Sequence, residues 1–197
     1  MAIEAFMAFK QYAGSGGAWL GSESQINFSN GAETLMSAPT KLLQGTIFEI
    51  QDFTFDIAQS LTIASQSSGA GAGKVTFNPF CVTRHTDRVS PLLFQMACTG
   101  AAFETVVLLL RRSAGAPAAG AASGLVFLRF DFKLVAVKSI AYAYDSEAPK
   151  ELVTFEYGGL QIRYAQQTAN GALGALTQGG WNRVKNVADT GPQPIPL

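Results

Sequence analysis

Apolar and polar residues alternate at every second position over most of residues 48–164, and this pattern constrains the chain more than any other feature. A β-strand points successive side chains to opposite faces, so a period of two is typical of strands with one face against a core. The longest run covers residues 125–144, where Phe130 and Phe132 fall in one phase and Asp131 in the other. At about 3.3 Å per residue that run would extend about 65 Å unbroken. It must therefore bend or project beyond the body.

Two positions where the alternation changes phase predict bends in the strands. Phe48 and Ile50 are out of phase with Phe53 and the residues that follow, so a bulge is expected around Gln51. A second change falls at Gly158-Gly159, and glycines are typical where a strand turns a corner.

Only one segment has the signals of a helix, beginning at Ser90-Pro91 and ending before Gly100. Ser90 is expected to cap it, Pro91 suits the first helical turn, and Gly100 suits a left-handed C-terminal residue. Four residues share its apolar face: Leu92, Leu93, Met96 and Ala97. Many strands, one helix and no βαβ alternation predict a mainly β fold, an antiparallel β-barrel or two-sheet barrel with one short flanking α-helix.

The remaining segments are expected to be loops of a single domain spanning residues 1–197. Residues 14–43 form a long loop excursion, residues 65–74 are rich in Gly and Ser, and residues 113–124 form an Ala/Gly insertion. A Pro-rich tail follows at residues 188–197.

Composition limits the classes of partner. Charged residues make up only 14% of the chain and hydrophobic residues 48%, which suggests that other subunits cover part of the surface. The net charge of zero predicts no nucleic-acid partner, and no apolar stretch approaches the ~20 residues that a membrane span needs. Because the first residues lack the pattern of a signal peptide, we expect a cytoplasmic protein that only a dedicated machine exports.

The residues that could suggest catalysis, phosphate binding or metal binding do not complete a known motif. Gly69–Lys74 lacks the first Gly and the final Ser or Thr of a phosphate-binding loop, so no cofactor is predicted. Cys81, His85 and Asp87 could be imagined as a nucleophile set, but no orienting third group is evident, so we predict no catalytic residue. One His and two distant cysteines (Cys81 and Cys98, both expected to be buried) predict no metal site.

Several segments, taken in order, resemble the haemolysin-coregulated protein (Hcp) family of type VI secretion systems. They are the Gly-rich loop before a strand (Gly69–Lys74), the Ser-Pro helix with its Cys-Thr-Gly exit (Ser90–Gly100), the strand Glu151–Tyr157, and Gly180-Trp181-Asn182 followed by Asn186-Val187. The resemblance covers roughly residues 48–187.

The resemblance implies six-membered rings that stack into a tube inside a contractile sheath. It also implies contacts with sheath, spike and baseplate proteins, small effector proteins held in the ring lumen, and export by the type VI machine. The family places the Gly-rich excursion where one ring meets the next. The ring-stacking residues implied here are Ser65, Ser68, Gly69, Gly71, Gly73 and Lys74.

Three alternatives remain open from the sequence. One is a tail-tube protein of a phage or phage-like contractile injection particle, which shares this architecture. Another is a small-molecule-binding β-barrel, which would be a monomer with an enclosed apolar cavity. The third is an enzyme, which is disfavoured because the sequence offers no set of catalytic residues.

Overall fold

The structure is a computed structural model that describes residues 3–12, 17–24, 26, 45–60, 75–112, 125–144, 148–168 and 173–189. Its elements, in chain order, are β1 (Ile3–Gln11), β2 (Phe48–Ile50), β3 (Asp52–Thr54), β4 (Ile57–Gln59), β5 (Val75–Phe77), β6 (Phe80–His85), α2 (Ser90–Thr99), β7 (Ala102–Arg112), β8 (Val126–Tyr144), β9 (Pro149–Gln167), β10 (Leu173–Asn182) and β11 (Val187–Ala188).

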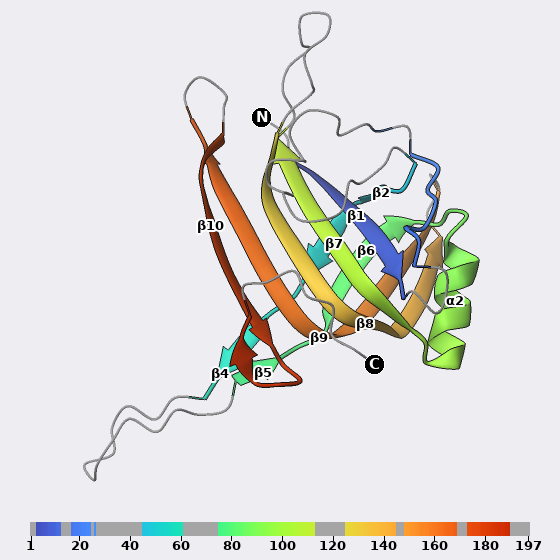
Figure 1. Ribbon diagram of the computed structural model, residues 1–197. Helices are drawn as coiled ribbons and strands as arrows, with labels where there is room; N and C mark the ends of the chain where they lie inside the picture. The colour runs from blue at the N-terminus through green and yellow to red at the C-terminus, as the bar shows by residue number, and fades with distance from the viewer. Residues whose placement is uncertain are drawn as a thin grey trace, which may run out of the picture.

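Nine of the strands form one antiparallel sheet, ordered β11-β10-β9-β8-β7-β1-β2, with β6 paired to the first half of β9 and β3 paired to β6. β4 and β5 form a separate two-stranded sheet. The strands curl around one core, and α2 packs at one side of it (Figure 1). The predicted mainly β, antiparallel fold with one short flanking helix is confirmed for the described residues.

The sheet is not closed into a barrel, so that part of the prediction is corrected. β2 pairs with β1, whereas β3 pairs with β6, and the change of partner occurs at Gln51. The Gln51 backbone N–H donates to the carbonyl of Thr83 at 2.8 Å. The phase change in the sequence at Gln51 therefore marks a real bend, at which the chain crosses from one side of the sheet to the other without a continuous ladder.

The core lies on the concave side of the sheet and is dominated by phenylalanines. Six of them are almost fully buried: Phe9, Phe48, Phe80, Phe103, Phe132 and Phe155. A smaller cluster lies on the opposite face of β1 and β7, around Phe6, Val107 and Leu109. β7 is therefore buried on both faces, as its continuous apolar sequence indicates.

Both long strands change face near their middle. In β8, Phe132 and then Val135 point into the core, so the phase shifts at Leu134, whose φ is 49°. Opposite Leu134, a side chain at Gly158 would approach the Leu134 Cβ to 3.2 Å. The phase change at Gly158 is confirmed, but the period-two run of residues 125–144 does not keep one phase, because its core-facing positions change at Leu134.

α2 begins one residue earlier than predicted. The position before the helix is Val89, and Ser90 is a buried first residue of the helix that makes no cap. The Asp87 carboxylate accepts from the Val89 N–H at 2.8 Å instead. Gly100 closes the helix in the left-handed conformation with φ 69°, as expected.

Candidate interaction surfaces

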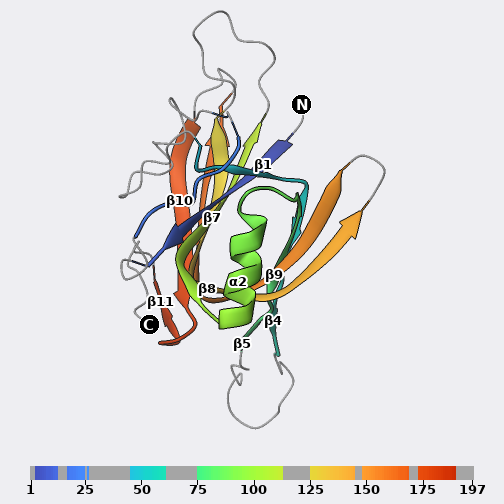
Figure 2. The same ribbon diagram turned by 90° about the vertical axis from the view of Figure 1, so that its right-hand side faces the viewer.

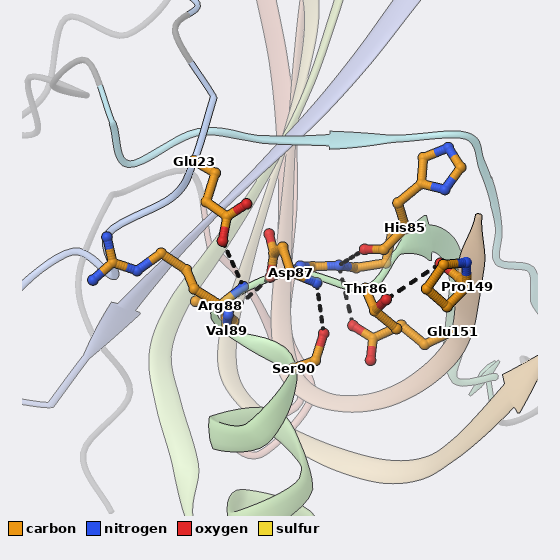
Figure 3. A network of polar contacts seen from close by, with 10 residues as sticks. Glu23, His85, Thr86, Asp87, Arg88, Val89, Ser90, Pro149 and Glu151 are labelled. Atoms are coloured by element: carbon orange, nitrogen blue, oxygen red, sulfur yellow. Dashed lines mark hydrogen bonds and ion pairs between the residues drawn. The ribbon is translucent and has the colours of Figure 1, made fainter. Parts of the chain in front are cut away.

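A buried ion cluster ties the start of α2 to β6 and β9 (Figure 3). We call Arg84, Asp87, Ser90 and Glu151 the Arg84 cluster. The Arg84 Nε lies 3.1 Å from the Glu151 carboxylate, and its Nη2 pairs with Asp87. The Ser90 hydroxyl accepts from the Asp87 N–H at 3.0 Å. The cluster joins three elements that are distant in sequence, so it fixes the helix against the sheet.

The burial of Glu151 was not predicted, because a charged residue beside Pro149 in a hairpin is typical of solvent exposure. Glu151 is 0% exposed and Arg84 2% exposed. Burial raises the pKa of Glu151 above its ordinary 4.5, while the Arg84 guanidinium and the nearby Ser90 hydroxyl oppose the rise.

This raised pKa predicts a specific pH dependence of stability. The folded protein binds the Glu151 proton more tightly than the unfolded chain, so the contribution is complete below pH 4.5 and is lost as pH rises through the folded pKa. Wild type and Glu151→Gln share all other titrating groups. The difference in their free energies of unfolding, wild type minus variant, should therefore shrink as pH rises from 4 to 8. A difference that stays constant or grows in urea titrations across this range would contradict the assignment.

A second buried polar cluster crosses β8 and β9 on the face opposite the main core. Asp131 accepts from the Arg129 Nε at 2.7 Å and lies 3.8 Å from an Arg163 nitrogen. Arg163 also donates to the Gln161 side chain at 2.7 Å. All four side chains are buried, and burial lowers the pKa of Arg163. Alternation placed these residues on one face, but it could not show that this face is buried.

Residues that the sequence singled out for possible chemistry do not converge. The Cys81 sulfur contacts the Thr154 hydroxyl at 3.3 Å, and the His85 ring contacts Gln51 at 2.7 Å. Asp87 is held in the Arg84 cluster. Within the described ranges no three His, Cys, Asp or Glu side chains gather as metal ligands. Cys98 is exposed and Cys81 is only partly buried, which corrects the expectation that both cysteines are buried.

Two strand edges form no backbone hydrogen-bond ladder with another described strand. The pairing of β8 with β7 ends where Ala136 faces Ala102. Beyond Ala136, β8 pairs with β9 alone. β10 likewise pairs only with β9 over residues 173–179. The β8–β9 hairpin ends and β10 lie on opposite sides of the molecule (Figure 2). Apolar side chains are exposed at the hairpin end, where Tyr142 is 56% and Tyr144 82% exposed.

The β4–β5 hairpin projects from the lower left of the body in Figure 1 and leads to the predicted stacking loop. Its base is fixed by Asn78, whose side chain donates to Asp56 at 2.6 Å. All three residues of β4 are exposed. The six predicted stacking residues (Ser65, Ser68, Gly69, Gly71, Gly73 and Lys74) lie outside the described residues, as do residues 113–124 and most of residues 14–43.

The only helix among the described residues, α2, is too short to cross a membrane.

The sequence profile of the family described as "Type VI secretion system effector, Hcp" matches residues 43–164, well over half of the chain. The chain belongs to the Hcp family. No curated protein matches it closely enough to count as a relative.

Solved structures of Hcp proteins share the fold. A structure described as a type six secretion system protein is 21% identical, covers 95% of this chain and 100% of its own, and superposes with a TM-score of 0.74. Hcp1 from Salmonella typhimurium is 17% identical, with coverage of 96% and 100% and a TM-score of 0.63. A type VI secretion system effector from Yersinia pestis is 16% identical, with coverage of 90% and 98% and a TM-score of 0.60.

Membership of the Hcp family assigns the chain's role. Hcp proteins are structural, assemble into the type VI tube and are secreted by that system. The protein is therefore a tube subunit of a type VI secretion system, and the phage tail-tube alternative is not favoured.

Proposed function

We propose that this Hcp protein forms rings of six identical subunits, and that the rings stack head to tail into the tube. The subunit is made in the cytoplasm and forms part of the tube wall, and it does not act as an enzyme. The tube contacts the sheath, spike and baseplate proteins of the machine, and small effector proteins occupy the ring lumen before export.

The observation that carries this proposal is a pair of strand edges, on opposite sides of the subunit, that no other described strand pairs with. One edge is β8 beyond Ala136, and the other is β10 over residues 173–179. Exposed edges favour pairing with another chain. Two different surfaces on opposite sides suit a heterologous interface, which closes into a ring when the rotation between subunits divides a full turn.

Exposed aromatic rings beside the β8 edge provide a test. Tyr144 is 82% exposed in the subunit, so Tyr144→Glu should leave the subunit folded. In the ring the new carboxylate would have to be buried without a partner, and assembly should fail. Size-exclusion chromatography with light scattering should find folded monomer for Tyr144→Glu and rings for Tyr144→Phe, which keeps the apolar ring. Rings formed equally by both variants would contradict a role of this edge in assembly.

The loop of residues 65–74 is proposed to mediate stacking between rings. It is rich in Gly and Ser, and it belongs to the connection between β4, whose three residues are exposed, and β5. Shortening the loop while keeping β4 and β5 should leave single rings intact and reduce tube formation at least about tenfold at equal concentration, about 1.4 kcal/mol of stacking free energy. Electron microscopy would count tubes and rings. A shortened variant that forms tubes as readily as the parent would overturn the stacking role, while the loss of rings themselves would place the loop within the ring interface.

A further inference from the structure

A cavity of about 530 Å³ lies between β5 of the β4–β5 hairpin, the middle of β9 and the turn that joins β10 to β11 (Figure 1). We call it the Tyr157 cavity. Its lining combines apolar and aromatic side chains with a cation: Val75, Phe77, Tyr157, Trp181, Val184 and Arg183. A volume of about 300–1,000 Å³ is usual for sites that bind small ligands. The cavity is therefore large enough to hold one.

Two hydrogen-bond donors of the lining residues have no partner. The Tyr157 hydroxyl and the Trp181 indole nitrogen are both buried and unbonded, and Tyr157 as a whole is only 3% exposed. Burial is the main cause that raises the pKa of the Tyr157 hydroxyl above its ordinary 10.0, so the group stays protonated at neutral pH and can donate. A buried donor without an acceptor is unfavourable, so both groups suit a ligand that brings acceptor oxygens.

Arg183 supplies a third group of donors, and its position is fixed by the surrounding residues. Its guanidinium carbon lies 4.8 Å from the centroid of the Tyr157 ring and 5.3 Å from that of Phe77. Its backbone N–H donates to the Gly158 carbonyl at 2.8 Å, and its Nη1 donates to the Tyr157 carbonyl at 2.5 Å. Its side-chain contacts with β9 use Nη1, and a guanidinium has further N–H donors on Nε and Nη2. The cation is therefore already in place for a ligand.

The charge of Arg183 is only partly balanced by Glu156. The Glu156 carboxylate lies 3.5 Å from Arg183 Nη1, which is longer than an ordinary hydrogen bond of about 2.7–3.2 Å. Its other oxygen pairs with Lys138 at 3.1 Å. Asp56, the second carboxylate that acts on Tyr157, accepts a hydrogen bond at the base of the hairpin. Arg183 and Lys138 thus share one carboxylate, which favours a ligand with a single negative charge.

A carboxylate on a small apolar body fits this combination of groups. Its two oxygens accept several hydrogen bonds, and they pair with a guanidinium more strongly than a neutral acceptor does. We propose that the Tyr157 cavity binds a small apolar monocarboxylate. Its oxygens accept from Tyr157, Trp181 and Arg183, and its aliphatic part packs against Phe77 and Val184. A free branched-chain acid and the C-terminal residue of a polypeptide share this chemistry. The site lies within one subunit and does not depend on the proposed ring contact.

Fluorine NMR tests this proposal, because the chain has only two tryptophans. In full-length protein labelled with 5-fluorotryptophan, Trp19→Phe identifies the Trp181 resonance. N-acetyl-L-leucine should shift the Trp181 resonance saturably and leave that of Trp19 in place. N-acetyl-L-leucinamide, in which a neutral amide replaces the carboxylate, should bind at least about tenfold more weakly. Equal binding of the acid and the amide, or no saturable shift with the acid at tens of millimolar, would overturn the proposal.

The variant Tyr157→Phe locates the site, because it removes the hydroxyl and keeps the ring. It should weaken binding of N-acetyl-L-leucine about tenfold or more, as expected for the loss of a hydrogen bond to a charged group. It should not lower the urea midpoint of unfolding, since the hydroxyl has no partner in the fold. The matched control is Tyr164→Phe, an exposed tyrosine on the same strand, which should bind as wild type does. Equal binding by the two variants would overturn the site. A lowered urea midpoint for Tyr157→Phe would also overturn it, because the hydroxyl would then serve the fold.

A third probe distinguishes the two sources of the ligand. 4-Methylpentanoate has the carboxylate and branched chain of N-acetyl-L-leucine but lacks its acetamido group. Binding of N-acetyl-L-leucine at least about tenfold tighter than 4-methylpentanoate would assign the site to the C-terminal residue of a polypeptide. Equal or tighter binding of 4-methylpentanoate would assign it to a free acid.

Discussion

Replacement of Phe80 by alanine should lower the free energy of unfolding by about 3–5 kcal/mol, because the side chain fills the centre of the core. Phe80 is fully buried, and its ring stacks on Phe132 with centroids 4.0 Å apart and on Phe155 at 4.9 Å. These contacts join β6, β8 and β9. Truncation would leave a cavity between three strands that a sheet cannot close by a small shift.

Urea unfolding at one fixed protein concentration measures this effect, since assembly would otherwise alter the apparent stability. The matched control is Phe94→Ala on α2, where the ring is 56% exposed and the expected change lies within about 0.5 kcal/mol. A loss for Phe80→Ala no larger than that of Phe94→Ala would show that Phe80 does not pack as described.

Replacement of Arg84 by methionine should be of similar severity, about 3–5 kcal/mol at pH 7.5. Methionine keeps an unbranched apolar side chain beside Phe48, whose ring centroid lies 5.0 Å from the guanidinium carbon. It removes the cation, so the fully buried Glu151 loses its charge partner. The loss should be smaller at acidic pH, where Glu151 takes up a proton.

A double-mutant cycle separates the charge effect from packing. The double variant Arg84→Met with Glu151→Gln should be more stable than Arg84→Met alone, because no buried carboxylate remains. Lys138→Met serves as the control: its pair with Glu156 is 3.1 Å long but exposed, and should contribute about 0–1 kcal/mol. If the two single losses simply add in the double variant, Arg84 and Glu151 are not coupled.

Alternation in the sequence predicted most of the strands, because most strands of the sheet have one face towards the main core. It also located the bends at Gln51 and Gly158, since a change of phase moves side chains to the other face. It failed at Leu134, where a left-handed residue shifts the phase inside a run that reads as continuous. No glycine marks that position, and left-handed backbone is uncommon for leucine.

The ion clusters could not be predicted from spacing. Arg84 and Glu151 face each other through the pairing of β6 with β9, and the sequence does not specify which strands pair. The prediction of Ser90 as the helix cap failed in a similar way. The role of Ser90 depends on its hydrogen bond with Asp87 and on the neighbouring strands, which the sequence does not specify. The exposed edges of β8 and β10, which carry the proposed ring contact, also follow from pairing rather than from local pattern.

The mass of the purified protein in solution tests the central claim most directly. Light scattering at tens of micromolar, with electron microscopy of the same sample, should find rings of about six subunits, about 125 kDa for a 20.8 kDa chain. A homogeneous 20.8 kDa monomer at that concentration, with no rings in the images, would contradict assembly as a tube subunit.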